Sequence, residues 1–286
     1  MKKMFKMAVN LMAVVLIAVC TFGLSACEDI KQLDITVQVY DHADSSFYAE
    51  SDVKFTVDLY RHLAHKTVDK VIEYVNAGYY DNVVFYQNTS ENSAIFVGDL
   101  KFVDGELQEN RINGKLPSEM YGEFEYNGTT GSNLVNQKGS IAIWRSYYEQ
   151  DDGLTTSSDA RNSGRATWLI PTATKASYDG NVCVFAQYDK ENTANAKAIS
   201  AISMIFSDTS YYTEYVIYYT GEYDEAKADD NYGLTFRAVK ADDFDDDTEV
   251  FTAEGKQLVC YNKKTVRIPN AVDGESSAKI KSVKVK

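Results

Sequence analysis

The fold is decided by residues 53–99, which read VKFTVDLYRHLAHKTVDKVIEYVNAGYYDNVVFYQNTSENSAIFVGD. From Val53 to Leu59, apolar and polar residues alternate, which is the period of a half-buried strand. A helical pattern follows, in which Thr67 is the expected N-cap and residues 68, 71, 72 and 75 place apolar side chains on one face. Gly78 stands where the end of a helix favours positive φ, and Val83 opens another strand. The stretch predicts strand, loop, helix, strand and strand, in that order.

Three motifs within this stretch resemble the front half of a cyclophilin-type prolyl isomerase domain. They are Lys66-Thr67-Val68, Gly78-Tyr79-Tyr80-Asp81 and Phe85-Tyr86-Gln87, which are similar to K-T-V, G-Y-Y-D and F-H-R of that family. Further fragments follow in the family's order at residues 123–124 (EF), 134–145 (LVNQKGSIAIWR), 162–170 (NSGRATWLI), 179–185 (DGNVCVF) and 280–285 (IKSVKV). The resemblance implies a mainly β fold, a closed eight-stranded antiparallel barrel with an α-helix over each open end.

Two segments do not match the family pattern, at about residues 146–159 and 208–270. In the second, residues 211–219 and 234–239 alternate as strands, and Phe251 with residues 256–266 suggests another strand pair. We therefore expect a β-rich insertion in the C-terminal half of the domain. The first barrel strand is expected at residues 33–40 and the second helix at residues 192–205.

The N-terminus has the pattern of an export signal. Lysines at positions 2, 3 and 6 precede an apolar run at residues 11–22 and the sequence LSAC at residues 24–27. The ending is similar to a bacterial lipobox, in which Cys27 would carry lipid; a membrane-spanning anchor or an ordinary cleavable signal are the alternatives. The expected organisation is a lipoprotein signal peptide at 1–26, a short tether at 27–32 and a cyclophilin-like domain at 33–286. The expected location is extracytoplasmic, on a membrane of the cell envelope, because several acyl chains on one residue hold a protein firmly.

The formal charge of −13, or −16 without the three leader lysines, argues against nucleic acid as a partner. The resemblance instead implies a proline-containing polypeptide or protein client. The cysteines that remain after Cys27 are Cys183 and Cys260. They are permitted to form a disulfide outside the cytoplasm, or Cys183 is a small buried apolar residue.

The resemblance also implies where a substrate would bind. Gln87 stands where the family keeps the arginine that hydrogen-bonds the prolyl nitrogen, and a neutral amide is a weaker donor than a guanidinium. The remaining substrate-binding positions, mostly replaced as well, fall at Phe85, Phe96, Trp144, Thr167, Trp168 and Val182. Trp168 is expected to form the floor of the groove, whereas Phe96 and Trp144 are large enough to fill the proline slot.

No cofactor and no metal site are expected. His62 and His65 have a spacing that chelates metals on a helix, but no other ligand stands beside them, and surface histidines are the simpler interpretation. The acidic run at residues 242–249 lacks the D-x-D-x-D-G pattern of a calcium loop and fits a solvated loop. Three hypotheses follow: a lipid-anchored isomerase whose activity is weak or lost, a non-catalytic binding protein that uses the barrel groove or the insertion, and a structural surface lipoprotein.

Overall fold

The computed structural model of the chain describes residues 31–112, 136–144, 164–174, 178, 182–222, 234–244, 250–253 and 256–286. The expected signal peptide, the lipidation site at Cys27, most of the tether and the insertion at 146–159 lie outside these residues. So do residues 123–124, 134–135, 145, 162–163 and 179–181 of the matched fragments. The elements are β1 (Gln32–Asp41), β2 (Ser46–Phe47), η1 (Glu50–Asp52), β3 (Lys54–Leu59), α2 (His65–Asn76), β4 (Val83–Asn88), β5 (Glu91–Val103), β6 (Glu106–Glu109), β7 (Ser140–Trp144), β8 (Trp168–Pro171), β9 (Val182–Tyr188), α4 (Thr193–Ile205), β10 (Tyr212–Glu222), β11 (Thr235–Lys240), η5 (Ala241–Asp243), β12 (Val250–Ala253), β13 (Lys256–Pro269), β14 (Ala271–Val272), β15 (Glu275–Ser276) and β16 (Ala278–Val285).

Eight of these strands close into an antiparallel barrel, as the sequence predicts. The order around the barrel is β4-β16-β1-β3-β9-β7-β8-β5, and the pairing of β4 with β5 closes it. Strand β1 shows why the sequence folds this way, because Leu33, Ile35, Val37 and Val39 alternate with polar residues and are all fully buried. Because the barrel is closed, each of these eight strands has a paired neighbour on both sides.

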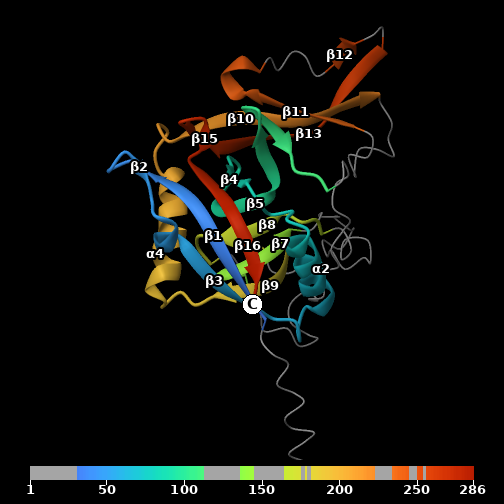
Figure 1. Cartoon of the computed structure of the whole chain (residues 1–286). Helices are drawn as coiled ribbons and strands as arrows, with labels where there is room; N and C mark the ends of the chain where they lie inside the picture. Colours follow the sequence, from blue (N-terminus) through green and yellow to red (C-terminus); the bar gives the residue numbers. More distant parts are fainter. Residues whose placement is uncertain are drawn as a thin grey trace, which may run out of the picture.

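The two helices lie on opposite sides of the barrel (Figure 1). Helix α2 packs on β16 and β9, and α4 packs on β3 and β1. The end of α2 is as predicted, with φ of +70° at Gly78. Its start is not, because the helix begins two residues before Thr67, and the residue that precedes it, Ala64, makes no side-chain cap. Neither helix is long and apolar enough to cross a membrane; this holds for the described residues.

Thr67 is not an N-cap because it belongs to the buried face of α2. It is 0 % exposed, and its Oγ1 lies 3.4 Å from Sγ of Cys183 on β9. Val68, Val71 and Val75 are buried on the same helix, as the sequence predicts. Packing against the barrel therefore overrides the capping preference of this threonine.

Strands β10, β11, β12 and β13, here called the insert sheet, extend the barrel sheet outward. Strand β10 pairs with β11 and β13, and β12 pairs with the first part of β13. The connection to the barrel is the far end of β13, where Val266 and Arg267 pair with Asn88 and Gln87 of β4. In Figure 1 the insert sheet lies beyond β4 and β5, at the end of the molecule away from the C-terminus.

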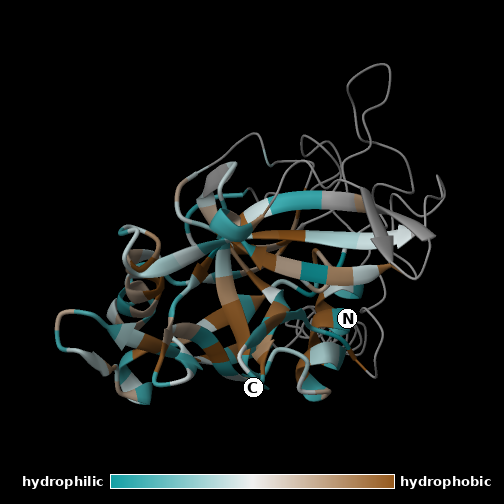
Figure 2. Ribbon diagram, turned by 90° about the horizontal axis from the view of Figure 1, so that it is seen from above, coloured by the Kyte–Doolittle hydropathy of each residue, from teal (hydrophilic) through white to brown (hydrophobic). Residues whose placement is uncertain are grey.

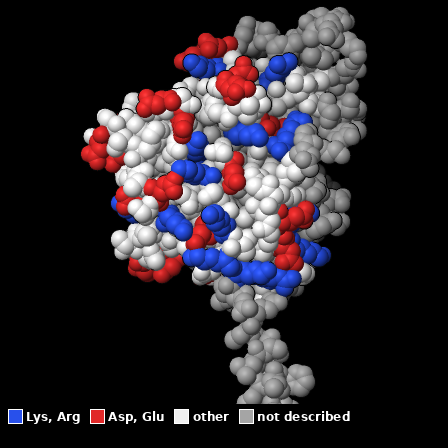
Figure 3. Space-filling view, viewed as in Figure 1, with Lys and Arg blue, Asp and Glu red and all other residues white. Residues whose placement is uncertain are grey.

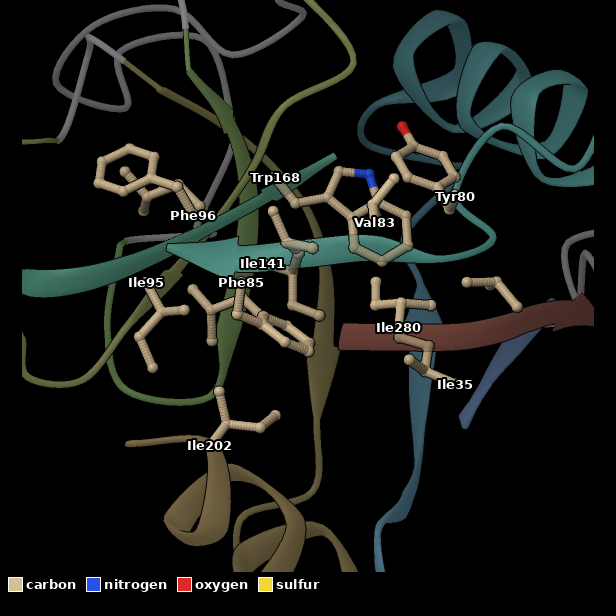
Figure 4. Packing of buried hydrophobic residues seen from close by; sticks show 14 of the residues in the cluster. Ile35, Tyr80, Val83, Phe85, Ile95, Phe96, Ile141, Trp168, Ile202 and Ile280 are labelled. Atoms are coloured by element: carbon tan, nitrogen blue, oxygen red, sulfur yellow. The ribbon is translucent and has the colours of Figure 1, made fainter. Parts of the chain in front are cut away.

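The core fills the barrel and continues under both helices. In Figure 4, Phe85, Ile35, Ile280 and Ile141 converge from different strands, and Ile202 of α4 approaches from one side. Figure 2 shows the hydrophobic residues concentrated in the barrel strands, with hydrophilic residues common at strand ends and connections. Burial of this surface is the main favourable contribution to folding.

Candidate functional site

The expected substrate positions fall in two neighbouring rows across β4, β5, β8 and β7. One row places Phe85, Val97, Trp168 and Ile143 opposite one another, and the next row places Tyr86, Phe96, Leu169 and Ala142 opposite one another. Directly opposed residues share a face, and adjacent residues point to opposite faces. The two rows therefore face opposite sides of the barrel wall.

Phe85 and Trp168 belong to the row that points into the barrel. Both are 0 % exposed. The ring of Trp168 lies 4.3 Å from that of Tyr80 and 5.9 Å from that of Phe185, measured between centroids. Figure 4 shows Trp168 beside Tyr80 in the interior. The structure thus places Trp168 in the core rather than at the floor of an outer groove.

Leu169 is the residue that β8 places beside Phe96, and the resemblance to the family did not identify it. The signal that points to it is the alternation of the strand, since Leu169 follows the inward-facing Trp168. Its side chain is fully buried.

Phe96 lies in the outer row and is stacked on Tyr86. The two ring centroids are 5.4 Å apart with an angle of 21° between the planes, and the residues are 4 % and 1 % exposed. Figure 4 shows Phe96 and Ile95 on opposite sides of β5. From the insert sheet, Nζ of Lys264 lies 5.3 Å from the centre of the Tyr86 ring. The outer face of β4 and β5 is therefore covered at this point.

Tyr86 is held in place by a carboxylate. Its hydroxyl donates to Oδ2 of Asp99 over 3.0 Å. Burial, together with the charge of Asp99, raises the pKa of Tyr86 well above its usual value. The phenol therefore stays neutral and serves as a hydrogen-bond donor.

Gln87 is also enclosed, at 5 % exposed, and its neighbour is a guanidinium from the insert sheet. Nη1 of Arg267 donates to Oε1 of Gln87 over 3.1 Å. Gln87, Arg267 and Glu214 stand directly opposite one another on β4, β13 and β10. Nε of Arg267 pairs with Oε1 of Glu214 at 3.1 Å, and the guanidinium lies 5.2 Å from the centre of the Tyr212 ring. A positive charge thus lies next to Gln87, the residue at the family's arginine position, but it comes from another strand.

The remaining expected site residues lie at the adjoining strand ends. Trp144 is the last residue of β7 and pairs with Val182 at the start of β9. Val182 is 4 % exposed, and Thr167, which precedes β8, is half-buried. The side chain of Trp144 lies outside the described part of the chain, so whether it fills the proline slot stays a prediction.

A second contact fastens the insert sheet to the barrel, through Glu109 of β6. Its Oε1 accepts a hydrogen bond of 2.6 Å from the hydroxyl of Tyr219 on β10, and Oε2 pairs with Arg111 at 2.8 Å. Burial and this carboxylate raise the pKa of Tyr219. Next to this contact, a groove of about 970 Å³ opens between β6 and the strands β10 and β11.

Neither described cysteine takes part in a disulfide. Cys183 is buried on β9, as the apolar alternative expects, and Cys260 lies on β13 opposite Thr220. His65 begins α2 and His62 precedes it. Within the described residues, no three histidine, cysteine or acidic side chains gather as metal ligands would. Asp242 and Asp243 lie in η5, and residues 245–249 of the acidic run are outside the described part.

Comparison with known proteins agrees with the barrel topology. Residues 46–217 match the family described as cyclophilin type peptidyl-prolyl cis-trans isomerase/CLD, and the chain belongs to this family. Two similar solved structures are of a Cryptosporidium parvum cyclophilin type peptidyl-prolyl cis-trans isomerase. One of them is described as being in the presence of the dipeptide Ala-Pro. The two structures share 13 % sequence identity with the chain, with TM-scores of 0.40 and 0.41. The matches cover 63 % of this chain and 89 % and 88 % of those chains. No curated protein matches the chain.

Proposed function

We propose that this member of the cyclophilin family binds polypeptides outside the cytoplasm and has weak or no isomerase activity. The observation that carries the proposal is the stack of Phe96 on Tyr86, in which both rings are almost fully buried and Lys264 of the insert sheet lies over the Tyr86 ring. A proline ring needs an open apolar slot, and the aromatic side chains occupy this outer face themselves. A fold by itself does not provide an activity, which depends on the residues of the site.

The electrostatics of Gln87 support the same conclusion. Rotation about the prolyl bond has a barrier of about 18–20 kcal/mol, which falls when the amide resonance is weakened. The amide Nε2 of Gln87 is a neutral donor, so its hydrogen bond to a prolyl nitrogen would be weaker than that of a charged guanidinium. The guanidinium of Arg267 is itself engaged by Gln87, Glu214 and the ring of Tyr212.

A protease-coupled assay on proline-containing tetrapeptides tests this proposal. We expect the full-length protein to leave the rate at its uncatalysed value, on a timescale of about tens to hundreds of seconds, while an active cyclophilin accelerates it. The protein should at the same time capture a permanently unfolded polypeptide, such as reduced and carboxymethylated albumin. Efficient turnover, or no capture of the unfolded chain, would contradict the proposal.

Weak isomerase activity is the second candidate, and Arg267 is the observation that favours it. Its guanidinium donates to Gln87, the residue at the position of the missing arginine, and its side chain is half-buried, at 24 % exposed. If the second candidate holds, residual activity should disappear in Arg267→Ala and persist in Gln87→Ala. Activity that is the same in both variants and the unchanged protein would exclude Arg267 as its source.

We also propose that Cys27 carries the lipid that attaches the protein to the membrane. The support is the order of basic start, apolar run and LSAC in the first 27 residues. Labelling of cells with a fatty-acid analogue should mark the unchanged protein and not Cys27→Ala. Cys183→Ala is the matched control and should still be labelled, whereas label on Cys27→Ala would rule out this attachment site.

A further inference from the structure

The main path of strands in the described sheet has two ends, and they lie close to each other. One end is β11 and the other is β6; within the described residues, each has a hydrogen-bonded neighbour on one side. Strand β6 pairs with β5, and β11 pairs with β10, but the two edges do not pair with each other. The groove of about 970 Å³ lies between them and is lined by residues 105–109 and 236–240.

An open strand edge presents a row of backbone N–H and C=O groups. Such an edge binds another extended chain readily, and one recurrent mode of peptide recognition adds a strand in this way. An extended backbone is the ligand that satisfies these groups, because its own donors and acceptors repeat with the same spacing.

The side chains along the groove indicate which kind of strand fits. Leu107, Phe236 and Ala238 supply apolar surface. Arg237 and Lys240 are exposed on β11, and neither forms an ion pair with a described residue. These charges stand out because the chain as a whole is strongly acidic, at −13. The face shown in Figure 3, by comparison, has Lys and Arg interspersed with Asp and Glu.

The described acidic side chains of the groove do not form ion pairs with Arg237, which can therefore pair with an acidic group of a ligand. Glu109 already accepts from Tyr219 and pairs with Arg111. Glu106 begins β6 and Asp243 lies in η5, and neither forms an ion pair with Arg237 within the described residues. An acidic side chain opposite Arg237 would complete a cross-strand ion pair.

We propose that the groove between β6 and β11 binds an extended polypeptide segment as an added strand, in which apolar side chains alternate with acidic ones. This inference rests on the proposed polypeptide-binding function and assigns its site. It differs from binding at the family's proline groove, whose described side chains are buried except for the half-buried Thr167.

Fluorescence anisotropy with the full-length protein in detergent tests the site. The probe is a labelled peptide of sequence Thr-Val-Glu-Val-Glu-Val-Thr, compared with the same peptide carrying lysine for glutamate and with a version whose alternate backbone nitrogens are methylated. We expect binding of the first peptide only, because the second reverses the charge and the third cannot donate the hydrogen bonds of a ladder. Equal binding of the methylated peptide, or no binding of the first up to about 1 mM, a very weak affinity, would overturn the proposal.

Two variants with the same change in charge locate the peptide. Arg237→Glu should weaken binding about tenfold or more, since it places like charges together. Lys284→Glu is the control, an exposed residue on β16 away from the groove, and should bind as the unchanged protein does. Equal loss in both variants would attribute binding to net charge and overturn the site.

The unfolded polypeptide separates failure of the site from failure of the function. If Arg237→Glu captures that polypeptide as well as the unchanged protein, the site is wrong and the polypeptide-binding function stands. If the unchanged protein captures nothing, both are wrong.

Discussion

At the scale of single residues, Gly98 combines a positive φ with a backbone atom too close for any side chain. Its φ is +124°, and a Cβ there would lie 2.6 Å from the backbone oxygen of Ala166 and 3.2 Å from Cε1 of Tyr80. Both neighbours are held firmly, since the hydroxyl of Tyr80 donates to the same Ala166 oxygen over 3.0 Å. The position therefore needs both the conformational freedom and the small size of glycine.

We expect Gly98→Ala to lower the free energy of unfolding by about 2–4 kcal/mol, from strain and clash together. Gly274→Ala is the matched control, because Gly274 also has positive φ, of +81°, but nothing lies within 4 Å of its Cβ position. Urea unfolding followed by tryptophan fluorescence measures both. Equal losses would show that the contact with Ala166 is unimportant.

The residues of the candidate site were only partly predictable. The motif placed Gln87 correctly on β4, because local patterning defines that strand. It gave no sign of Arg267, which is 180 residues away in sequence and meets Gln87 only through the pairing of β13 with β4. Trp168 was expected to form the floor of a groove, and strand alternation directs it into the core instead.

At the scale of elements, α4 has a well-defined N-cap. The side chain of Asn192 accepts hydrogen bonds from the backbone nitrogens of Ala194 and Asn195, at 3.0 and 3.3 Å. These groups would otherwise be unsatisfied at the start of the helix. The residue is exposed, so its removal leaves the core unchanged.

We expect Asn192→Ala to destabilise the protein by about 1 kcal/mol through the lost cap, which lowers the midpoint of thermal unfolding by about 2–4 °C. Asn192→Asp should be as stable as the unchanged protein, because a carboxylate caps a helix as well as an amide does. Circular dichroism during heating gives both midpoints. The interpretation fails if the aspartate variant loses as much as the alanine variant.

The elements were more predictable than the site. The helix at residues 192–205 and the strands at 33–40 and 211–219 follow local patterns, and the structure has them within a few residues. The start of α2 was missed because the sequence shows that Thr67 can cap a helix, whereas only packing shows that it faces Cys183. Local chemistry defines the elements here, and contacts between elements decide their ends.

At the scale of the whole molecule, His42 joins the barrel to the start of the insert sheet. Its ring stacks on Tyr211 with centroids 3.6 Å apart and planes 11° apart, and Tyr40 packs against its edge at 5.0 Å. Burial lowers the pKa of His42 below 6.5, although Asp41 and Asp208 partly oppose the shift. The folded protein therefore holds this imidazole neutral.

This environment predicts a loss of stability as the solution becomes acidic. In the unfolded chain His42 takes up a proton near pH 6.5, whereas in the folded protein it does so only at a lower pH. The free energy of unfolding therefore decreases as pH falls through 6.5, until the lower pKa of folded His42 is reached. Above pH 6.5 its contribution is constant. Urea unfolding at a series of pH values should show this slope, and His42→Phe should reduce it. An unchanged slope in that variant would assign the effect to other groups.

The closed barrel was predictable as a whole because the matched fragments follow one another in the family's order. The position of the insert sheet was not, since alternating residues predict a strand but not the neighbour with which it pairs. The contact between Tyr219 and Glu109 joins residues 110 apart in sequence, and together with the pairing of β13 with β4 it holds the insert sheet beside the barrel.

The neighbouring first and last strands of the barrel determine how the molecule can be tethered. Val285 pairs with Leu33, and the backbone nitrogen of Lys286 donates to the oxygen of Gln32 over 2.8 Å. Five peptide steps separate Cys27 from Gln32, a reach of at most about 18 Å. With a lipid on Cys27, the C-terminus would therefore be held near the bilayer, and the insert sheet, at the opposite end in Figure 1, would point toward the surrounding medium. A label fused after Lys286 would then lie between the protein and the membrane. A circularly permuted chain that joins Lys286 to Gln32 could have its new termini in another loop without disturbing the barrel.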